Sequence, residues 1–258
     1  MASSHNADQQ LPVRVLGGPT AAFEYGGLRF LTDPTFDGPG DYQNPGRPLL
    51  TKTAPAAAQP AELGRIDVVL LSHDEHADNL DRSGRDLLAD VALTLTTTGG
   101  ARRLGGTAKG LGDWEQVTVD RPDGGTVTVT GVPAIHGPGK REEVEPFTGQ
   151  VTGFVLTGEG LPTVYVSGDN ASLEAVGEIA ARFAPVDTAV LFAGAPRIPV
   201  LFDGAPLVLD SAQAAEAARL LDARRVVTVH HDSWAHFTEG RDEIVAAFDA
   251  AGLADRLV

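Results

Sequence analysis

Ligand-type side chains crowd the stretch from Ile66 to Asp81, which reads IDVVLLSHDEHADNLD. It opens with an apolar run, Val68 to Leu71, that predicts a short buried strand. The polar part that follows holds two histidines and several acidic or amide residues: His73, Asp74, Glu75, His76, Asp78, Asn79 and Asp81. Imidazole nitrogens and carboxylate oxygens bind hard or borderline divalent ions. Because α/β proteins place their chemistry in loops that follow strands, this stretch predicts a metal site. The alternative is a solvated acidic loop that contains two histidines by chance.

Other predicted strands end in residues of the same kind. Asp33 follows a predicted strand, and His136, Asp169 and His230 each follow an apolar run. Six of the seven histidines lie in three clusters, at positions 73/76, 136, and 230/231/236. Strand ends along one sheet edge converge in space, so these positions could supply the three or four protein ligands of a metal site. The chain has no cysteine, so a histidine and carboxylate site suits Zn, Mn, Fe or Mg.

Composition limits the class of protein and its partners. The chain has 258 residues, 42% hydrophobic and 21% charged, which is ordinary for a globular protein. A net charge of −15 argues against nucleic acid as a partner and favours a small-molecule substrate. No apolar run approaches the roughly 20 residues of a membrane span. The N-terminus lacks a signal-peptide pattern, so a cytoplasmic location is the default expectation. Residues 1–10 are expected to be a disordered tail, and 11–258 a single domain.

The order of the predicted elements favours one α/β domain built from two similar halves. Strands are predicted at 13–16, 21–25, 28–31, 67–71, 91–97, 116–119, 126–136, 151–157, 162–166, 187–193 and 225–229. Helices are predicted at 82–89, 172–183, 211–221 and 238–250, and a further helix is predicted to begin near 101. Residues 37–62 are rich in Pro, Gly and Ala and lack periodicity, which predicts a long loop over one face.

Five segments, in this order, resemble the metallo-β-lactamase superfamily of metal-dependent hydrolases, and within it the branch of ascorbate-6-phosphate lactonase-like proteins. The segments are GGPTAAFEYGGLRFLTDPTFD, VVLLSHDEHADNLD, VPAIHGP, VYVSGDN and VVTVHHDSWAHFTEG. The resemblance implies an αββα four-layer sandwich, with two mixed β-sheets inside, helices outside and a metal centre at one edge.

The family's metal loop reads His-x-His-x-Asp-His, and this chain departs from it twice. On this resemblance, His73 and His76 match the two paired histidines and Asp78 matches the aspartate. One residue is inserted between the histidines, so an alternative register puts Glu75 in place of the second one. Asn79 stands where the last histidine of the loop is expected.

The remaining ligands come from later segments of the same resemblance. His136 matches the third histidine, Asp169 the bridging aspartate, and His230 the last histidine, with His231 in the following position. The resemblance thus implies a first ion on His73, His76 and His136. A second ion would take Asp78, Asp169 and His230, and because Asn79 offers only a weak amide ligand, that ion is expected to bind less tightly. Either one ion or two is compatible with this set.

The predicted activity follows from this centre. Asp33, Glu75, Asn79, His231, Trp234 and His236 are expected to lie behind the ligands or to face the substrate, and the pocket is expected to be lined by residues 37–62 and 234–237. A divalent ion lowers the pKa of a bound water, and Asp78 or Asp169 would orient that water and take its proton. We expect hydrolysis of a small-molecule ester, lactone or amide. The alternatives are a metal-dependent phosphodiesterase, or a metal-depleted member that acts as a binding protein or metal-independent catalyst.

Overall fold

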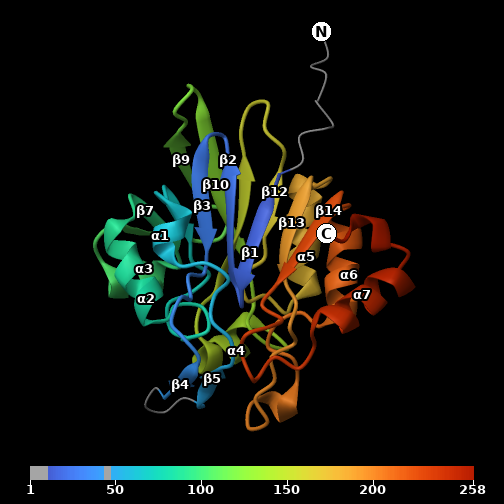
Figure 1. Cartoon of the computed structure of the whole chain (residues 1–258). Helices are drawn as coiled ribbons and strands as arrows, with labels where there is room; N and C mark the ends of the chain where they lie inside the picture. The colour runs from blue at the N-terminus through green and yellow to red at the C-terminus, as the bar shows by residue number, and fades with distance from the viewer. Residues whose placement is uncertain (1–10, 44–47) are drawn as a thin grey trace.

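The computed structural model describes residues 11–43 and 48–258, and it contains two six-stranded mixed β-sheets (Figure 1). The first sheet has the strand order β1 (Val13–Gly17), β2 (Thr20–Tyr25), β3 (Leu28–Thr32), β6 (Val68–Leu70), β7 (Leu93–Thr96) and β8 (Ala108–Gly110). The second has the order β14 (Arg225–Val229), β13 (Thr188–Phe192), β12 (Val164–Val166), β11 (Thr152–Thr157), β10 (Thr126–Pro133) and β9 (Gln116–Asp120). The tail predicted at 1–10 lies outside the described residues, and the extent of the domain stays a prediction.

The two sheets repeat one pairing pattern. In the first, β1, β2 and β3 pair antiparallel, and β3, β6, β7 and β8 then run parallel. In the second, β9 to β12 pair antiparallel, and β12, β13 and β14 run parallel. The expectation of two similar halves, each β-rich and then β–α alternating, is therefore met by the topology.

The sheets pack face to face around one shared core. Phe30, Val68 and Leu70 of the first sheet lie in the same buried cluster as Phe154 and Phe192 of the second. Intervening residues on the same strands, such as Val69 and Leu191, are buried against the helices outside. Strands covered on both faces must be apolar at consecutive positions, which explains the unbroken runs VVLL and AVLF.

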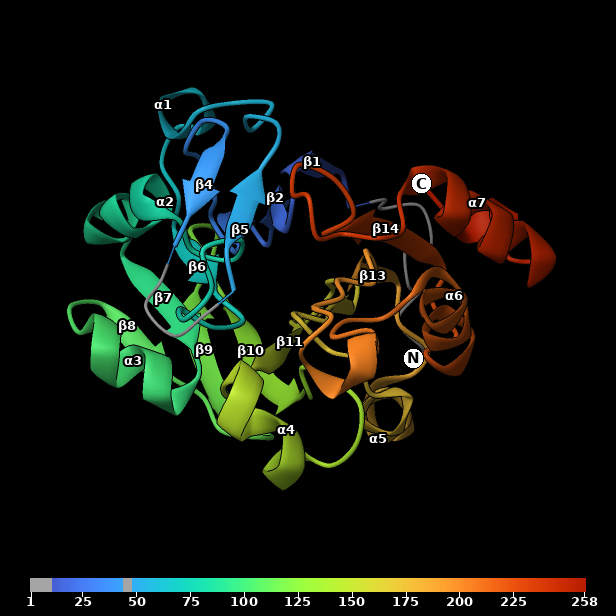
Figure 2. The same ribbon diagram turned by 90° about the horizontal axis from the view of Figure 1, so that it is seen from below.

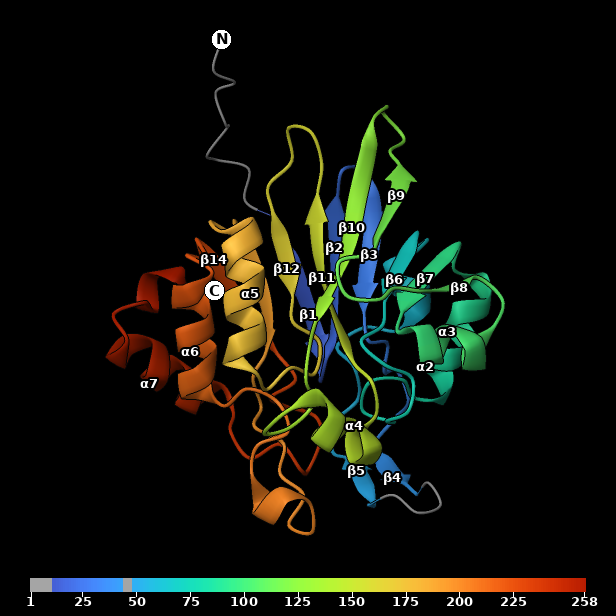
Figure 3. The ribbon, with the colours of Figure 1, turned by 180° about the vertical axis from the view of Figure 1, so that it is seen from behind.

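Helices cover the two outer faces of the sandwich (Figures 1 and 3). On the first sheet lie α1 (Pro60–Leu63), α2 (Arg82–Leu87) with the short η1 (Leu88–Asp90), and α3 (Thr98–Leu104). On the second lie α5 (Leu173–Phe183), α6 (Ser211–Leu220) and α7 (Arg241–Ala250); two further turns are η2 (Phe202–Gly204) and η3 (Ala254–Arg256). Asp210 caps α6, because its carboxylate accepts from the Gln213 amide. The αββα sandwich is confirmed, and none of the described helices is long and apolar enough to cross a membrane.

The short edge strand β8 was not predicted, and two segments at one end of the sandwich also differ from the sequence prediction. Residues 37–62 are not one loop, because they contain the hairpin of β4 (Gly40–Tyr42) and β5 (Leu50–Lys52) and then α1. These strands have three residues each, too few to show alternation in a sequence. The second segment forms α4 (Arg141–Thr148), a helix that was not predicted and that contains Pro146. Viewed from below, the hairpin, α4 and the segment before α6 surround one end of the sandwich (Figure 2).

Candidate metal centre

Three histidines from different strand ends meet at this edge of the sandwich. His73 and His76 follow β6, and His136 follows β10. The Nε2 atom of His73 lies 2.8 Å from Nδ1 of His76, which lies 3.3 Å from Nε2 of His136. Two nitrogens bound to one tetrahedral zinc ion at about 2.0–2.1 Å would be separated by about 3.4 Å. The spacing is close to that of ligands of a single divalent ion. Among the described residues, these three histidines form a group whose ligand atoms all lie within 4.8 Å of one another.

Hydrogen bonds outside the cluster fix which nitrogens face inward. Nδ1 of His73 lies 3.0 Å from the Ser72 hydroxyl, and Nδ1 of His136 lies 2.8 Å from the Leu207 carbonyl oxygen. A proton on Nδ1 of His136 leaves its Nε2 with a free lone pair, as metal ligation requires. Burial, together with His76 and His136, holds the pKa of His73 well below its ordinary value. His73 is therefore a neutral imidazole, the form that binds metals.

A second group of donors adjoins the three histidines. Nε2 of His230, at the end of β14, lies 3.5 Å from Oδ2 of Asp78 and 3.5 Å from Oδ1 of Asp169. The other oxygen of Asp169, Oδ2, lies 3.5 Å from Nε2 of His136. The two oxygens of Asp169 therefore face the two groups separately, which is the arrangement of a carboxylate that bridges two ions. Asp78, Asp169 and His230 are all buried.

Unpartnered polar atoms show that these side chains suit metal ions. Oδ1 of Asp78, Oδ2 of Asp169 and both ring nitrogens of His230 are buried and make no hydrogen bond within the described structure. Buried polar atoms almost always have a partner, so a cluster of orphans needs an explanation. Burial alone would lower the pKa of His230, but Asp169 and Asp78 raise it above its ordinary value. Cations at this position would satisfy the orphaned atoms and neutralise the two carboxylates.

Asp33 and Asn79 form a buried layer behind the ligands. Asp33 accepts from the Ser72 amide at 2.6 Å and from the Ser72 hydroxyl at 2.5 Å. The Asn79 amide group donates to Oδ2 of Asp33 and to Oδ1 of Asp169, both at 2.9 Å. Burial and the charge of Asp169 raise the pKa of Asp33 to about 7. Asp33 and Asn79 therefore orient Ser72, next to His73, and Asp169.

Unusual backbone conformations occur at two of these residues. Asp33 has φ 24° and His230 has φ 63°, in the left-handed region that side chains other than glycine rarely adopt. Such strain persists where the surroundings fix it, and it gathers at functional sites. A Cβ on Gly194 would lie 1.9 Å from the carbonyl oxygen of His230, so only glycine fits beside this ligand.

The remaining predicted site residues separate into two sets. Glu75 forms an ion pair with Arg103 at 3.1 Å, so His76, and not Glu75, joins the histidine cluster. Nε2 of His231 lies 3.2 Å from the Thr228 carbonyl oxygen and is not part of the histidine cluster. Trp234 is buried, with its ring centroid 5.3 Å from that of Tyr42, and it supports the site from behind. His236, by contrast, points into the site, with Nε2 2.9 Å from Oδ2 of Asp78.

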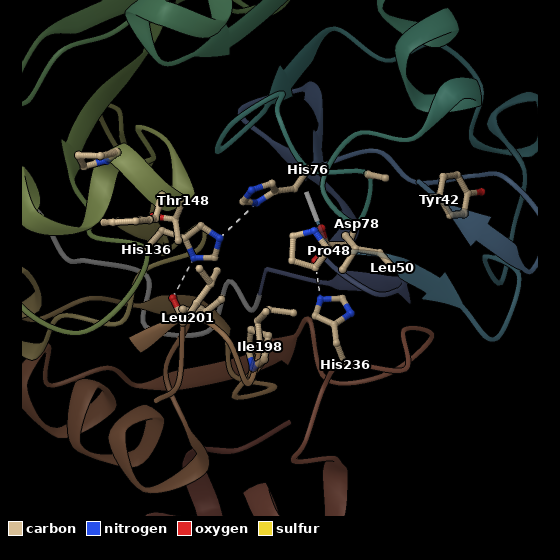
Figure 4. A pocket seen from close by; sticks show the side chains of 15 residues that line it. Tyr42, Pro48, Leu50, His76, Asp78, His136, Thr148, Ile198, Leu201 and His236 are labelled. Carbon is tan, nitrogen blue, oxygen red and sulfur yellow. Dashed lines mark hydrogen bonds and ion pairs between the residues drawn. The ribbon is translucent and has the colours of Figure 1, made fainter. Parts of the chain in front are cut away.

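An apolar cavity of 320 Å³ opens beside the donors (Figure 4). Its polar wall includes His76, Asp78 and His136 of the two donor groups, together with His236, which contacts Asp78. Its remaining wall contains Tyr42, Pro48, Leu50, Ala77, Pro146, Phe147, Thr148, Pro196, Ile198, Leu201 and Leu207. Among the described lining residues there is no lysine or arginine. As predicted, residues 37–62 contribute to the wall, but the segment 234–237 contributes through His236 and not through its aromatic rings.

Sequence reasoning missed the part of the wall that comes from α4 and from residues 196–207. The segments EPFT and RIPVLFDGAPL are apolar but have no strand or helix periodicity. Pro146 within α4 further hides the helix, because proline is rare in helix interiors. The excess of proline and large apolar residues in a non-periodic segment was the available signal for a pocket wall.

Comparison with known proteins agrees with this fold. The sequence profile of the beta-lactamase superfamily domain matches residues 28–231. A protein of Pyrococcus abyssi named as a metal-dependent hydrolase is 26% identical over 191 residues, covering 72% of this chain and 76% of its own. The isothiocyanate hydrolase of Delia radicum gut bacteria superposes with a TM-score of 0.77 at 21% identity, covering 95% of this chain and 94% of its own. A possible metal-dependent hydrolase of Veillonella parvula superposes with a TM-score of 0.75 at 15% sequence identity, covering 95% of each chain.

The profile match spans most of the chain, from β3 to the residue after His230. It includes the strand ends that carry both donor groups, and the similar structures share the sandwich that brings them together. The chain belongs to the beta-lactamase superfamily and has the fold of its metal-dependent hydrolases.

Proposed function

We propose that this metal-dependent hydrolase cleaves a small, uncharged and largely apolar ester, lactone or amide. The observation that carries the proposal is the cavity itself, which places the histidine cluster against a wall of aliphatic, proline and aromatic side chains. Ligand pockets bind through apolar walls, and a few convergent polar groups fix the orientation of the ligand. Here the polar groups are those of the metal centre, so the reactive part of the substrate would be its polar part.

Different residues would hold the metal ions, take up the proton of the water and bind the substrate. Divalent ions, with zinc as our first assignment, would be held by His73, His76 and His136, and by Asp78, Asp169 and His230. Such ions acidify a water and polarise a carbonyl oxygen. We assign uptake of the water's proton to Asp78 or Asp169, because each is buried and has one oxygen without a partner among the described residues. The apolar wall excludes other water and holds the substrate's hydrocarbon part.

The mouth of the cavity favours the same substrate class. Phe147, which lines the cavity, is 56% exposed, and Leu49 and Val200, each next in sequence to a lining residue, are 52% and 84% exposed. Phe147 and Phe202 meet edge to face with ring centroids 5.6 Å apart. Exposed apolar side chains gathered at one place mark a binding surface. An apolar molecule would thus meet apolar contacts from the opening inward.

The absence of lysine and arginine from the described wall favours a neutral substrate over the phosphodiesterase alternative. Enzymes that bind phosphates commonly add arginine, lysine or backbone amides to the metal ions that contact the phosphate oxygens. The same absence weighs against an anionic sugar phosphate, which the lactonase-like branch would suggest. A metal-depleted binding protein is disfavoured by the orphaned donors, which would be costly to keep buried without cations.

Competition between neutral and anionic substrates tests the proposal. We expect kcat/KM for p-nitrophenyl butyrate to exceed that for bis(p-nitrophenyl) phosphate by at least about a hundredfold, because the apolar wall suits a neutral acyl chain and its described residues offer a phosphodiester no cationic side chain beside the metal ions. Ile198→Arg in the wall should lower the ester rate at least about tenfold through a higher KM. Val245→Arg, at an exposed valine of α7 that does not line the cavity, is the matched control and should change it little. A γ-lactone, an anilide and benzyl isothiocyanate extend the panel to the other neutral electrophiles. Preference for the phosphodiester would refute the proposed substrate class.

A further inference from the structure

Asn79 supplies no imidazole to the second donor group. It stands where the superfamily loop is expected to supply a histidine, but its amide nitrogen donates to Asp33 and Asp169, both at 2.9 Å. The donor half of the side chain is thus committed to two carboxylates. If the second ion is bound with an imidazole in this place, that imidazole must come from another part of the chain.

His236 is positioned to supply it. Its Nε2 atom lies 2.9 Å from Oδ2 of Asp78, and Nε2 of His230 lies 3.5 Å from the same oxygen. Both separations are close to the roughly 3.4 Å expected between two ligands of one tetrahedral ion. Figure 4 shows the His236 ring reaching Asp78 across the cavity from the side opposite His76. Two imidazoles from later in the chain therefore lie close to Asp78. They belong to His230, at a strand end, and to His236, six residues further on.

The polar atoms at this point remain unsatisfied by protein alone. Oδ1 of Asp78, both nitrogens of His230 and Nδ1 of His236 are buried and have no hydrogen-bond partner within the described structure. If His236 only held Asp78 by a hydrogen bond, the approach of His230 to the same carboxylate without a hydrogen bond would have no explanation. A shared cation accounts for both approaches.

Main-chain pairing holds His236 in place independently of any ion. The Thr53 amide donates to the Ser233 carbonyl at 2.8 Å, and the Ala235 amide donates to the Thr51 carbonyl at 2.9 Å. These bonds attach the segment that carries His236 to β5. The His236 ring also packs on Phe237, with centroids 4.6 Å apart. Ligands that are fixed before binding lose little freedom when the ion arrives.

We propose that His236 is a ligand of a second metal ion, shared with Asp78 and His230, and that it replaces the imidazole lost at Asn79. The inference rests on the metal centre of the proposed function and deepens it. Asn79 then keeps a different task, which is to hold Asp169 and Asp33. The second site would accordingly not be the weak or empty site that the loop sequence alone implies.

Calorimetric titration of the metal-stripped protein with zinc tests this assignment, with bound metal counted independently by elemental analysis. The unmodified protein should bind two ions. His236→Ala should keep the first and weaken the second at least about a hundredfold, because even outer partners of ligands contribute 10–100-fold to affinity. His231→Ala, in the same segment but turned toward Thr228, is the matched control and should bind two ions as before.

His236→Gln separates ligation from positioning. Glutamine can still donate a hydrogen bond to Asp78 but offers no imidazole, so it should lose the second ion as alanine does. Loading with cobalt gives a second readout, since the visible spectrum of the second ion should disappear in both variants. Two ions bound with unchanged affinity in either variant, or one ion only in the unmodified protein, would overturn the assignment. Binding of no ion by the unmodified protein would instead defeat the proposed function as a whole.

Discussion

Alanine in place of His76 is expected to remove the ion held by the three histidines and to lower kcat/KM for a neutral ester on the order of a thousandfold or more. His76 is the central member of the cluster, because its Nδ1 atom lies within 3.3 Å of a nitrogen of each of the other two histidines. Two histidines cannot replace three ligands at a site that must keep an open position. The lost charge stabilisation of several kcal/mol corresponds to the expected decrease in rate.

Elemental analysis of purified His76→Ala, followed by steady-state kinetics, measures both parts of this expectation. His231→Ala serves as the control, since its ring contacts the main chain at Thr228 and not the cluster. Glu75→Gln is a second control, because the ion pair of Glu75 with Arg103 places it outside the ligand set. Full metal content in His76→Ala, or loss of metal in Glu75→Gln, would show that the ligand register is wrong.

Replacing Lys52 with methionine is expected to destabilise the fold by about 3–5 kcal/mol. The Lys52 ammonium lies 3.1 Å from Oδ2 of Asp81, and both side chains are almost completely inaccessible to solvent. Asp81 also accepts from the Asp37 and Gly84 amides, so its charge cannot leave the interior without breaking these bonds. Without Lys52, a buried carboxylate would lose its only salt-bridge partner among the described residues, which is the costly way to break such a pair.

Thermal and denaturant unfolding measure this effect, which should lower the melting temperature by about 10 °C in a chain of this length. Arg65→Met is the matched control, because Arg65 pairs with Asp67 while its own side chain is 80% exposed. Exposed pairs contribute about 0–1 kcal/mol, so this variant should unfold almost as the unmodified protein does. Equal destabilisation by the two substitutions would contradict the role given to the buried pair.

Much of the fold could be predicted because its strands carry strong local signals. The runs around Val68 and Val190 are apolar at consecutive positions, and both strands are buried on two faces. Helices α5 and α6 begin at Ser172 and Asp210, whose side chains accept from backbone amides of the first turn. By contrast, the hairpin of β4 and β5 has strands of three residues and depends on tertiary contacts, including the pairing of Lys52 with Trp234.

The ligand positions could be proposed from the sequence because each follows a strand. His136 comes three residues after β10 ends, and His230 comes directly after β14. The sequence holds no comparable signal for the direction in which a loop side chain points. His236 and His231 both lie near His230 in the sequence, yet only the pairing of residues 233–235 with residues 51–53 turns His236 toward Asp78. Likewise the insertion between His73 and His76 makes Glu75 an alternative ligand in the sequence, and only the contact of Glu75 with Arg103 in the structure excludes it.

Hydrolysis of a neutral ester by metal-stripped and reloaded protein tests the central claim most directly. The protein would be purified without added metal, treated with a chelator, assayed with p-nitrophenyl butyrate, and assayed again after stepwise addition of zinc, manganese or iron(II). We predict that activity disappears on chelation and returns in proportion to bound metal, with loss of the ion from the three-histidine site sufficient to abolish it. Undiminished hydrolysis by protein shown to contain no metal, or no hydrolysis of any neutral substrate after full reloading, would contradict the account.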